Sequence, residues 1–329
     1  MPEGDTIFRT ATALRRWLGG RRITTARSGV PGLDASRLVG RSVDTVETRG
    51  KHLLIRLSGG LSVHTHMRMT GSWHVYPAGE PWRKPVRQAR LVLAAGERVA
   101  VCFNAPTVEL LGARDERSHP SLRRLGPDVV APEAPDPVEV RRRARIRAAA
   151  SPTIAELLLD QQMVSGIGNV YRSECLFLCG LHPATAVAEL RDDQLDDLVA
   201  TASRLMRVNA RATSAPSRSF GPSSDDRGLP SAGRTWVYRR NGRPCRRCGS
   251  PVRRGLLGPQ ARAVYWCPVC QAARAPAAPG AMPGPAGQVG AELEVRTATT
   301  ADAATASGIV CGPTASCSAR RSTTAAPPS

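Results

Sequence analysis

The spacing of apolar residues changes soon after the chain begins. Between residues 7 and 18 apolar side chains follow a helical period, which Gly19 and Gly20 end. Beyond them, short apolar runs bounded by turn residues are typical of strands. We therefore expect a β-sandwich that carries one helix at its entrance. The strands are predicted at 21–26, 43–48, 52–57, 61–69, 90–94 and 98–103.

After a proline-rich stretch at 127–137 the apolar period becomes helical. In the last of these segments the apolar residues form one face behind Asp192 and Asp193, which are candidate helix-capping residues. The second domain is therefore expected to be helical. Its helices are predicted at 138–149, 153–164, 169–179 and 192–208.

Composition places the remaining boundaries. A stretch rich in Ser, Gly and Pro predicts a flexible loop, and the Ala/Pro/Gly/Thr/Ser tail lacks the apolar surface to fold. The chain is thus expected to be an α+β multidomain protein. The predicted parts are a β-sandwich at 2–130, a helical domain at 136–212, the loop at 213–235, a zinc finger at 236–273 and a disordered tail at 274–329.

The charge of the chain indicates its class of partner. Lys and Arg number 46 against 27 Asp and Glu, a net charge of +19, which suits a polyanion such as nucleic acid. Only Lys51 and Lys84 are lysines, although codon bias also explains an excess of arginine. The sequence contains no long apolar run, and the acidic residues Glu3 and Asp5 argue against an N-terminal signal peptide. We expect a soluble, cytoplasmic, nucleoid-associated monomer without membrane contact.

Two cysteine pairs predict a metal site. Each pair encloses two residues, and 18 residues separate the pairs, a length that suits a β-hairpin. Four thiolates would hold one structural Zn²⁺ and leave no open position for a catalytic water. A disulfide is the weaker alternative for a chain without a secretion signal. The predicted ligands are Cys245, Cys248, Cys267 and Cys270.

The cysteine module resembles a ribbon that faces a polyanion. An Asn241-Gly242 turn precedes it and predicts a zinc ribbon rather than a helical finger. Residues 236–273 contain eight arginines and no acid, so their charges are expected to face outward. Cys102, Cys175 and Cys179 are expected to pack as small buried residues, and Cys311 and Cys317 lie in the tail.

The segment "QQMVSGIGN" predicts a tight turn between two helices. Gly166 and Gly168 allow close backbone approach, and Asn169 is expected to cap the following helix. The amides of 167–170 and the Asn169 side chain could then bind a DNA phosphate. An ordinary helix–helix turn is the competing interpretation.

Four segments in this order resemble the bacterial formamidopyrimidine-DNA glycosylase and endonuclease VIII family. "MPEGDTIFR" is similar to the catalytic terminus of that family, and "VETRGKHLL" to its lysine segment. "QQMVSGIGNVYRSE" resembles its helix-two-turn-helix motif, and "YRRNGRPCRRCGS" with "ARAVYWCPVCQ" resembles its zinc finger. The likeness covers residues 2–271 and leaves out the tail.

The resemblance implies a covalent mechanism at the second residue. Removal of Met1 would give Pro2 a free secondary amine that can attack the sugar of a damaged nucleotide. The iminium that results would allow the same enzyme to cut the strand by elimination. By the same resemblance Glu3 is the acid/base that protonates the deoxyribose ring oxygen, and Lys51 contacts a phosphate and assists departure of the base.

The resemblance also implies how DNA is held. A flipped nucleotide leaves a gap, and "HMRMTG" lies where the family places its intercalating residue, which makes Met69 the predicted wedge beside Arg68 and Thr70. Alternatively Met69 is a core strand residue that alternates with Met67. Asn169 and Arg262 match phosphate-contacting residues, whereas Tyr171 is expected to pack.

Departures from the family narrow the substrate. The formamidopyrimidine branch carries an Arg and a Phe where this chain has Ala105, Pro106 and Thr107, which favours the endonuclease VIII branch and oxidised pyrimidines. The segment Arg68-Met69-Thr70 nevertheless differs from the usual Gln-Leu-Tyr wedge of that branch. We expect a bifunctional DNA glycosylase and lyase for double-stranded DNA with damaged bases or abasic sites. Oxidised-purine activity, single-stranded substrates and a noncatalytic DNA-binding role are the alternatives.

Overall fold

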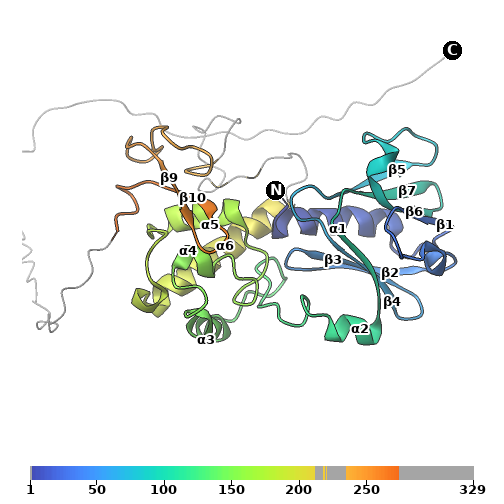
Figure 1. Cartoon of the computed structure of the whole chain (residues 1–329), viewed down its shortest axis with the longest axis horizontal. Coiled ribbons are helices and arrows are strands. Elements are labelled where there is room, and N and C mark those ends of the chain that lie inside the picture. Colours follow the sequence, from blue (N-terminus) through green and yellow to red (C-terminus); the bar gives the residue numbers. More distant parts are fainter. Residues whose placement is uncertain (1, 212–217, 219, 221–234, 274–329) are drawn as a thin grey trace, which may run out of the picture. The chain divides into compact units, whose positions relative to one another are not determined.

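The computed structural model describes residues 2–211, 218, 220 and 235–273, so the predicted loop at 213–235 and the tail lie almost wholly outside the described residues. All contacts below lie within one unit, Met1–Pro276. Figure 1 shows strands β1–β8 gathered beside helices α1 and α2, and helices α3–α6 on the side of the ribbon strands β9 and β10.

The N-terminal region is the predicted sandwich with its leading helix. Helix α1 spans Gly4–Leu18 and buries Ile7, Leu14 and Leu18 among the apolar inner faces of two four-stranded antiparallel sheets. The strand orders are β1-β6-β7-β5 and β2-β3-β4-β8. The strands are β1 (Thr25–Ser28), β2 (Val43–Arg49), β3 (His52–Leu57), β4 (Leu61–His66), β5 (Ser72–Pro77), β6 (Ala89–Ala95), β7 (Arg98–Phe103) and β8 (Thr107–Gly112).

The predicted strands were incomplete at three places. Strands β5 and β8 were missed because their burial does not alternate with period two. The first predicted strand begins late, since Arg22 forms only an isolated bridge with Ser42. Helix α2 (Ala113–Ser118) was missed because its sequence, ARDERS, has no apolar face. Short 3₁₀ helices lie at Ala35–Leu38, Val86–Gln88 and Val187–Glu189.

The second domain is helical, as predicted, with one shortened element. Thr153 and Glu156 form a reciprocal capping box that starts α4, but α4 covers Ile154–Leu157 and does not continue to residue 164. The Asp160 carboxylate accepts a hydrogen bond from the backbone N–H of Gln162 at 2.9 Å and turns the chain there. The other helices are α3 (Pro137–Arg147), α5 (Asn169–Leu178) and α6 (Asp192–Arg211).

The cysteine module is a ribbon, as predicted. Strands β9 (Arg253–Leu257) and β10 (Arg262–Trp266) pair antiparallel between the two cysteine pairs. The Asn241-Gly242 turn exists but lies before the hairpin, whose own turn has positive φ at Gly258 and Ala261. Phe177 of α5 packs into the small ribbon core, so the ribbon rests on the helix that follows the Gly-x-Gly turn.

Candidate active site

A cavity of about 430 Å³ brings together side chains from all three regions. Pro2 enters it from the start of the chain, Lys51 from the β2–β3 turn, Met69 from the segment after β4 and Arg262 from the ribbon. Four of the residues singled out in the sequence, more than 250 positions apart at the extremes, thus line one pocket. Pro2 itself is half-buried.

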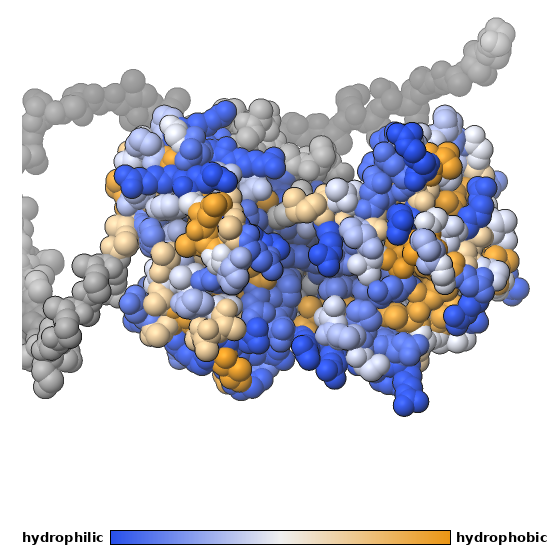
Figure 2. Space-filling model, in the orientation of Figure 1, coloured by the Kyte–Doolittle hydropathy of each residue, from blue (hydrophilic) through white to orange (hydrophobic). Residues whose placement is uncertain are grey.

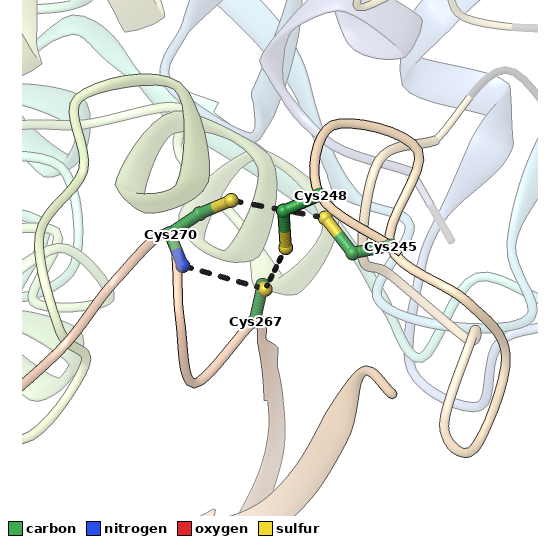
Figure 3. Close-up of side chains that lie close together, drawn as sticks. All are labelled: Cys245, Cys248, Cys267 and Cys270. Carbon is green, nitrogen blue, oxygen red and sulfur yellow. Dashed lines mark hydrogen bonds between the residues drawn. The ribbon is translucent and has the colours of Figure 1, made fainter. Parts of the chain in front are cut away.

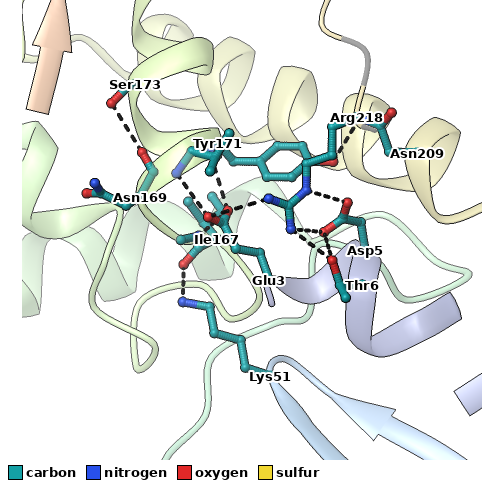
Figure 4. Close-up of polar contacts among 12 residues, drawn as sticks. Glu3, Asp5, Thr6, Lys51, Ile167, Asn169, Tyr171, Ser173, Asn209 and Arg218 are labelled. Carbon is teal, nitrogen blue, oxygen red and sulfur yellow. Dashed lines mark hydrogen bonds and ion pairs between the residues drawn. The ribbon is translucent and has the colours of Figure 1, made fainter. Parts of the chain in front are cut away.

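Glu3 lies at the start of helix α5 with its carboxylate completely buried. It accepts hydrogen bonds from the backbone N–H groups of Gly168 at 3.0 Å, Val170 at 2.9 Å and Tyr171 at 3.3 Å. Figure 4 shows this carboxylate pointing at the turn before α5. A helix N-terminus binds anions through such free N–H groups, and here a side chain of the same chain supplies the anion.

One expectation about this turn was wrong, and the Glu3 contacts bear on a second. Asn169 is not the helix cap, because the helix is preceded by Gly168 and the Glu3 carboxylate takes the capping contacts. Of the amides of 167–170 that were expected to bind a DNA phosphate, those of Gly168 and Val170 donate to Glu3, so this helix start positions an acid beside the pocket. The predicted close approach to the glycine backbone does occur, but the group that approaches it is the Glu3 side chain.

Both glycines of the turn are required by their surroundings. A Cβ on Gly168 would lie 2.4 Å from Glu3 Cδ and 2.7 Å from Glu3 Oε1, well inside contact distance. Gly166 has φ +104°, a conformation that L side chains rarely adopt, and its carbonyl accepts from the Gly4 N–H at 3.0 Å. The turn is thus shaped to receive the N-terminal segment.

A second buried carboxylate, that of Asp5, was not singled out from the sequence. It forms a two-pronged ion pair with Arg218, whose Nε and Nη2 donate to its oxygens at 2.6 Å and 2.8 Å. Burial lowers the pKa of Arg218, but the carboxylates of Asp5 and Glu3 raise it above its ordinary value. The guanidinium also lies over the Tyr171 ring, 5.4 Å from its centroid, and Tyr171 is buried, as expected. No sequence pattern marks Arg218, which comes from a Ser/Gly/Pro-rich stretch.

Lys51 reaches the turn from the opposite side. Its Nζ donates to the carbonyl of Ile167 at 2.5 Å (Figure 4). Burial lowers the pKa of Lys51, the Glu3 carboxylate raises it, and the nearby charges of Arg262 and Arg218 lower it; together they bring the pKa to about 8. Gly50 has φ +58°, and its N–H donates to the Asp128 carboxylate at 2.7 Å, which fixes the turn that carries the lysine.

The segment after β4 presents Met69 to solvent. Met69 is 65% exposed whereas Met67 is 1% exposed, so Met69 is not the core strand residue of the alternative interpretation. Strand β4 ends at His66, and Arg68 has φ +43°, which reverses the chain. Thr70 Oγ1 donates to the carbonyl of Asn104 at 3.1 Å and ties this segment to the β7–β8 turn.

Asn169 and Arg262 meet at the junction of α5 and the ribbon. Asn169 Nδ2 donates to the carbonyl of Ala263 at 2.8 Å, and its Oδ1 accepts from the buried guanidinium of Arg172. Arg262 is exposed at the start of β10, and its Nε donates to the Gln260 side chain at 2.8 Å. Hydrophilic side chains gather over the ribbon in Figure 2.

The four predicted zinc ligands converge (Figure 3). Their Sγ atoms all lie within 4.8 Å of one another; Cys245 and Cys270 are 3.9 Å apart, and Cys248 and Cys267 are 3.4 Å apart. Tetrahedral Zn–S bonds of about 2.3 Å place sulfurs about 3.8 Å apart, whereas a disulfide would need about 2.05 Å. The donor set therefore fits Zn²⁺. Of the other described cysteines, Cys102 and Cys175 are buried and Cys179 is half-buried.

Comparison with known proteins agrees with the site. The formamidopyrimidine-DNA glycosylase N-terminal domain family matches residues 1–107, and the formamidopyrimidine-DNA glycosylase H2TH domain family matches residues 125–219. Across the described residues, no helix is both long and apolar enough to cross a membrane.

Curated relatives align over nearly their whole length. "Probable endonuclease 8 2" of Streptomyces coelicolor is 39% identical over 279 residues, 84% of this chain and 96% of the relative. "DNA-(apurinic or apyrimidinic site) lyase Nei2" of Mycolicibacterium smegmatis is 36% identical over 83% of this chain and 100% of the relative. "Endonuclease 8" of Escherichia coli O17:K52:H18 is 33% identical over 82% of this chain and 100% of the relative.

Solved structures share the fold. The formamidopyrimidine-DNA glycosylase of Lactococcus lactis, crystallised with DNA containing an abasic site, superposes with a TM-score of 0.67 at 20% identity and covers 82% of this chain and 100% of its own. Because both domain families match in chain order and the curated relatives align from end to end, the chain belongs to the formamidopyrimidine-DNA glycosylase and endonuclease VIII family.

Proposed function

We propose that the protein is a bifunctional DNA glycosylase and abasic-site lyase of base excision repair that prefers oxidised pyrimidines. One observation carries the proposal: Pro2 and Lys51 line the same cavity, and Glu3 packs against the Gly168 backbone at its wall. A nucleophilic amine, a cation and a carboxylate are the groups that an excision through a covalent sugar adduct requires. The relatives named endonuclease 8 and abasic-site lyase are consistent with it.

The proposed reaction begins at Pro2 after Met1 has been removed. The secondary amine forms a bond to the anomeric carbon, the glycosidic bond breaks, and the base leaves with its electron pair and takes up a proton. Opening of the sugar gives an iminium between the proline nitrogen and C1′. Loss of a C2′ proton then expels the 3′ phosphate, and a second elimination expels the 5′ phosphate.

Glu3 and Lys51 have separate roles in this scheme. Glu3 transfers a proton to the sugar ring oxygen as it opens, and the α5 amides hold its carboxylate in place for that step. Lys51 contacts a phosphate of the damaged strand and assists departure of the base, with its ammonium aimed by the Ile167 carbonyl. Arg218 and Asp5 are positioning residues behind them.

DNA is proposed to lie along the cavity with the damaged nucleotide flipped into it. Met69, exposed beside Arg68 at the rim, enters the gap in the duplex. Arg262 and the Asn169 region contact the backbone, and the ribbon arginines add positive charge in a module that contains no acid. One Zn²⁺ held by the four cysteines would fold this ribbon and take no part in the chemistry.

The preference for pyrimidines is supported by the β7–β8 turn. Only Asn104, Ala105 and Pro106 separate the two strands, and Ala105 is buried. No long side chain from this turn is available to pair with the base left opposite the lesion. A glycosylase for oxidised purines with the same catalytic residues is the second candidate. Duplexes that each carry one damaged base distinguish the two, because the preferred substrate is the duplex whose strand is nicked.

Trapping with borohydride tests the proposal. Sodium borohydride added during incubation with duplexes carrying an oxidised pyrimidine, an oxidised purine or an abasic site should reduce the iminium and leave a protein–DNA adduct, strongest for the pyrimidine and the abasic site. Mass spectrometry should place the adduct on Pro2. A variant with an additional N-terminal residue ahead of Pro2 is the control and should form none. Absence of any adduct with the abasic duplex, or retention of Met1 in the active protein, would favour a noncatalytic DNA-binding role.

A further inference from the structure

A second group of possible metal ligands lies on the outer face of the sheet β2-β3-β4-β8. It consists of His64, Glu109 and His119, whose ligand atoms all lie within 4.8 Å of one another. None of the three lines the catalytic cavity, and the proposed excision chemistry uses none of them. His64 is buried, His119 is mostly buried and Glu109 is the most exposed of the three.

The fold places these three side chains together from separate elements. His64 of β4 and Glu109 of β8 are directly paired across the antiparallel ladder, so both side chains leave the same face of the sheet. His119 ends helix α2, which packs against β8 and β4. Glu116 of the same helix accepts two hydrogen bonds of 2.8 Å from Arg56 of β3 and anchors α2 on this face.

The distances match a coordination shell. His64 Nδ1 and His119 Nε2 each lie 3.1 Å from the same oxygen, Glu109 Oε2. Tetrahedral bonds of about 2.0–2.1 Å from zinc to nitrogen and oxygen place neighbouring ligand atoms about 3.3 Å apart. A cation could therefore enter with only small movements of the side chains.

The remaining ring nitrogens fit this arrangement as well. His64 Nε2 lies 2.9 Å from Nδ1 of the buried His52, the kind of outer partner that orients a metal-bound imidazole. With His64 Nδ1 on a metal, its Nε2–H donates to His52 Nδ1. His119 Nδ1 is buried with no hydrogen-bond partner among the described residues, so Glu109 is the one polar contact that orients this ring.

We propose that His64, Glu109 and His119 bind one divalent transition-metal ion of the Zn²⁺ class, separately from the four cysteines. Two imidazoles and one carboxylate suit such ions, and water would complete the shell on the exposed side of Glu109. The ion clamps the end of α2 onto the sheet whose strand β3 begins next to Lys51. The site is independent of the proposed glycosylase activity.

Cobalt binding to full-length protein that carries one equivalent of zinc, in its cysteine site, tests the second site. Co²⁺ should bind with one further equivalent and give visible d–d bands without the near-ultraviolet sulfur-to-cobalt band that a cysteine site produces. Metal analysis of protein dialysed against Zn²⁺ should find two equivalents per chain. One equivalent of zinc together with no cobalt uptake would overturn the proposal, as would cobalt bands of the cysteine type alone.

Three variants assign the ligands. Glu109→Gln and His119→Gln should each weaken Co²⁺ binding roughly 100-fold, and His52→Phe, which removes only the outer partner, about tenfold. Glu97→Gln, at an exposed turn of the same sandwich, is the matched control and should bind as the parent does. Zn²⁺ should raise the melting temperature of the parent and of the control but not that of Glu109→Gln. Equal Co²⁺ affinity in all four variants would contradict the assignment, and retained folding is checked by circular dichroism.

Discussion

The cysteine ribbon and the candidate active-site cavity are held together in opposite ways. The ribbon gathers four cysteines from a stretch of 26 residues, with a short hairpin between the two pairs. The cavity gathers its polar groups over long separations: Glu3 contacts the start of α5 across 165 positions, and Asp5 meets Arg218 across 213. Local spacing therefore builds one site, and tertiary folding builds the other.

The ribbon and the cavity also differ in how their charged side chains are neutralised. The eight ribbon arginines have no acid in the module to pair with, so much of their charge is left for a polyanion. Beside the cavity the carboxylates of Glu3 and Asp5 are completely buried and held by backbone amides or by Arg218. Removing one member of a buried ion pair leaves the charge of the other without a partner. Substitution of these buried groups should therefore lower the free energy of unfolding more than substitution of a ribbon arginine does.

The largest effect is expected for Glu3→Gln. Loss of the proton donor should lower base excision by roughly 10²–10⁴-fold, while cutting of ready-made abasic sites is partly retained. The new amide would also face backbone N–H donors of α5, at a cost of about 1–3 kcal/mol in the free energy of unfolding. Single-turnover excision and urea denaturation measure the two effects. The exposed Glu133→Gln is the control, and undiminished excision by Glu3→Gln would remove it from the mechanism.

The same contrast explains what the sequence could predict. Apolar runs bounded by turn residues located β3 and β7 to the residue, and helical periods located α5 to within one residue and the end of α1 at Leu18. The convergence of the four cysteines followed from spacing alone, since a ribbon needs only its own hairpin to close.

The partner of the α5 N-terminus could not be predicted in this way. The Gly-x-Gly turn indicated that an anion approaches, but neither the turn nor the helix identifies the anion. Glu3 fills that position because α1 and the sandwich carry the N-terminal segment to the turn, a consequence of tertiary packing. Asp5 and Arg218 were missed for the same reason, because their contact spans 213 positions and no local pattern encodes it. The shortened α4 was missed for a local reason, since the Asp160 turn interrupts the predicted helix.

Breaking the ribbon should give the next largest effect. Cys267→Ser removes a ligand, so the variant should lose one equivalent of zinc and the ordered hairpin. DNA binding should weaken roughly 10- to 100-fold at moderate salt. The slope of log Kobs against log salt should also fall by about 0.9 for each phosphate that the ribbon no longer neutralises. Cys102→Ser, a buried cysteine of the sandwich, is the control for metal content. Unchanged zinc in Cys267→Ser would contradict the four-ligand site.

A smaller effect is expected where the cavity is changed without removing a functional group. In Gly168→Ala the new Cβ would overlap the Glu3 carboxylate, which must move away from the α5 amides. We expect about a tenfold loss of excision and a destabilisation of about 1–3 kcal/mol, the usual cost of forcing atoms into a packed site. Gly112→Ala is the control, since its Cβ would meet only an Asp115 side-chain oxygen at 3.2 Å. Equal losses in both variants would show that the Glu3 contact is not the cause.

The smallest expected effect is a loss of activity at alkaline pH as Lys51 loses its proton. Because burial lowers the pKa of Lys51 to about 8, kcat/KM, which reports the free enzyme, should be halved near that pH and fall further above it. A nearby DNA phosphate favours the charged ammonium and raises the pKa of Lys51 in the enzyme–DNA complex. The fall in kcat should therefore occur at a higher pH than the fall in kcat/KM. Lys51→Arg stays charged and should lose this alkaline fall in activity, whereas Lys84→Arg, at the only other lysine, should keep it.

Stability should change in the opposite direction over the same range. Between about pH 8 and the ordinary lysine value of 10.5 the unfolded chain binds the extra proton, so the contribution of Lys51 to the free energy of unfolding rises with pH. Urea denaturation at several pH values, compared between the parent and Lys51→Arg, isolates this contribution. If activity and stability fell together in the parent, the alkaline fall in activity would reflect unfolding and the cavity lysine would not be its source.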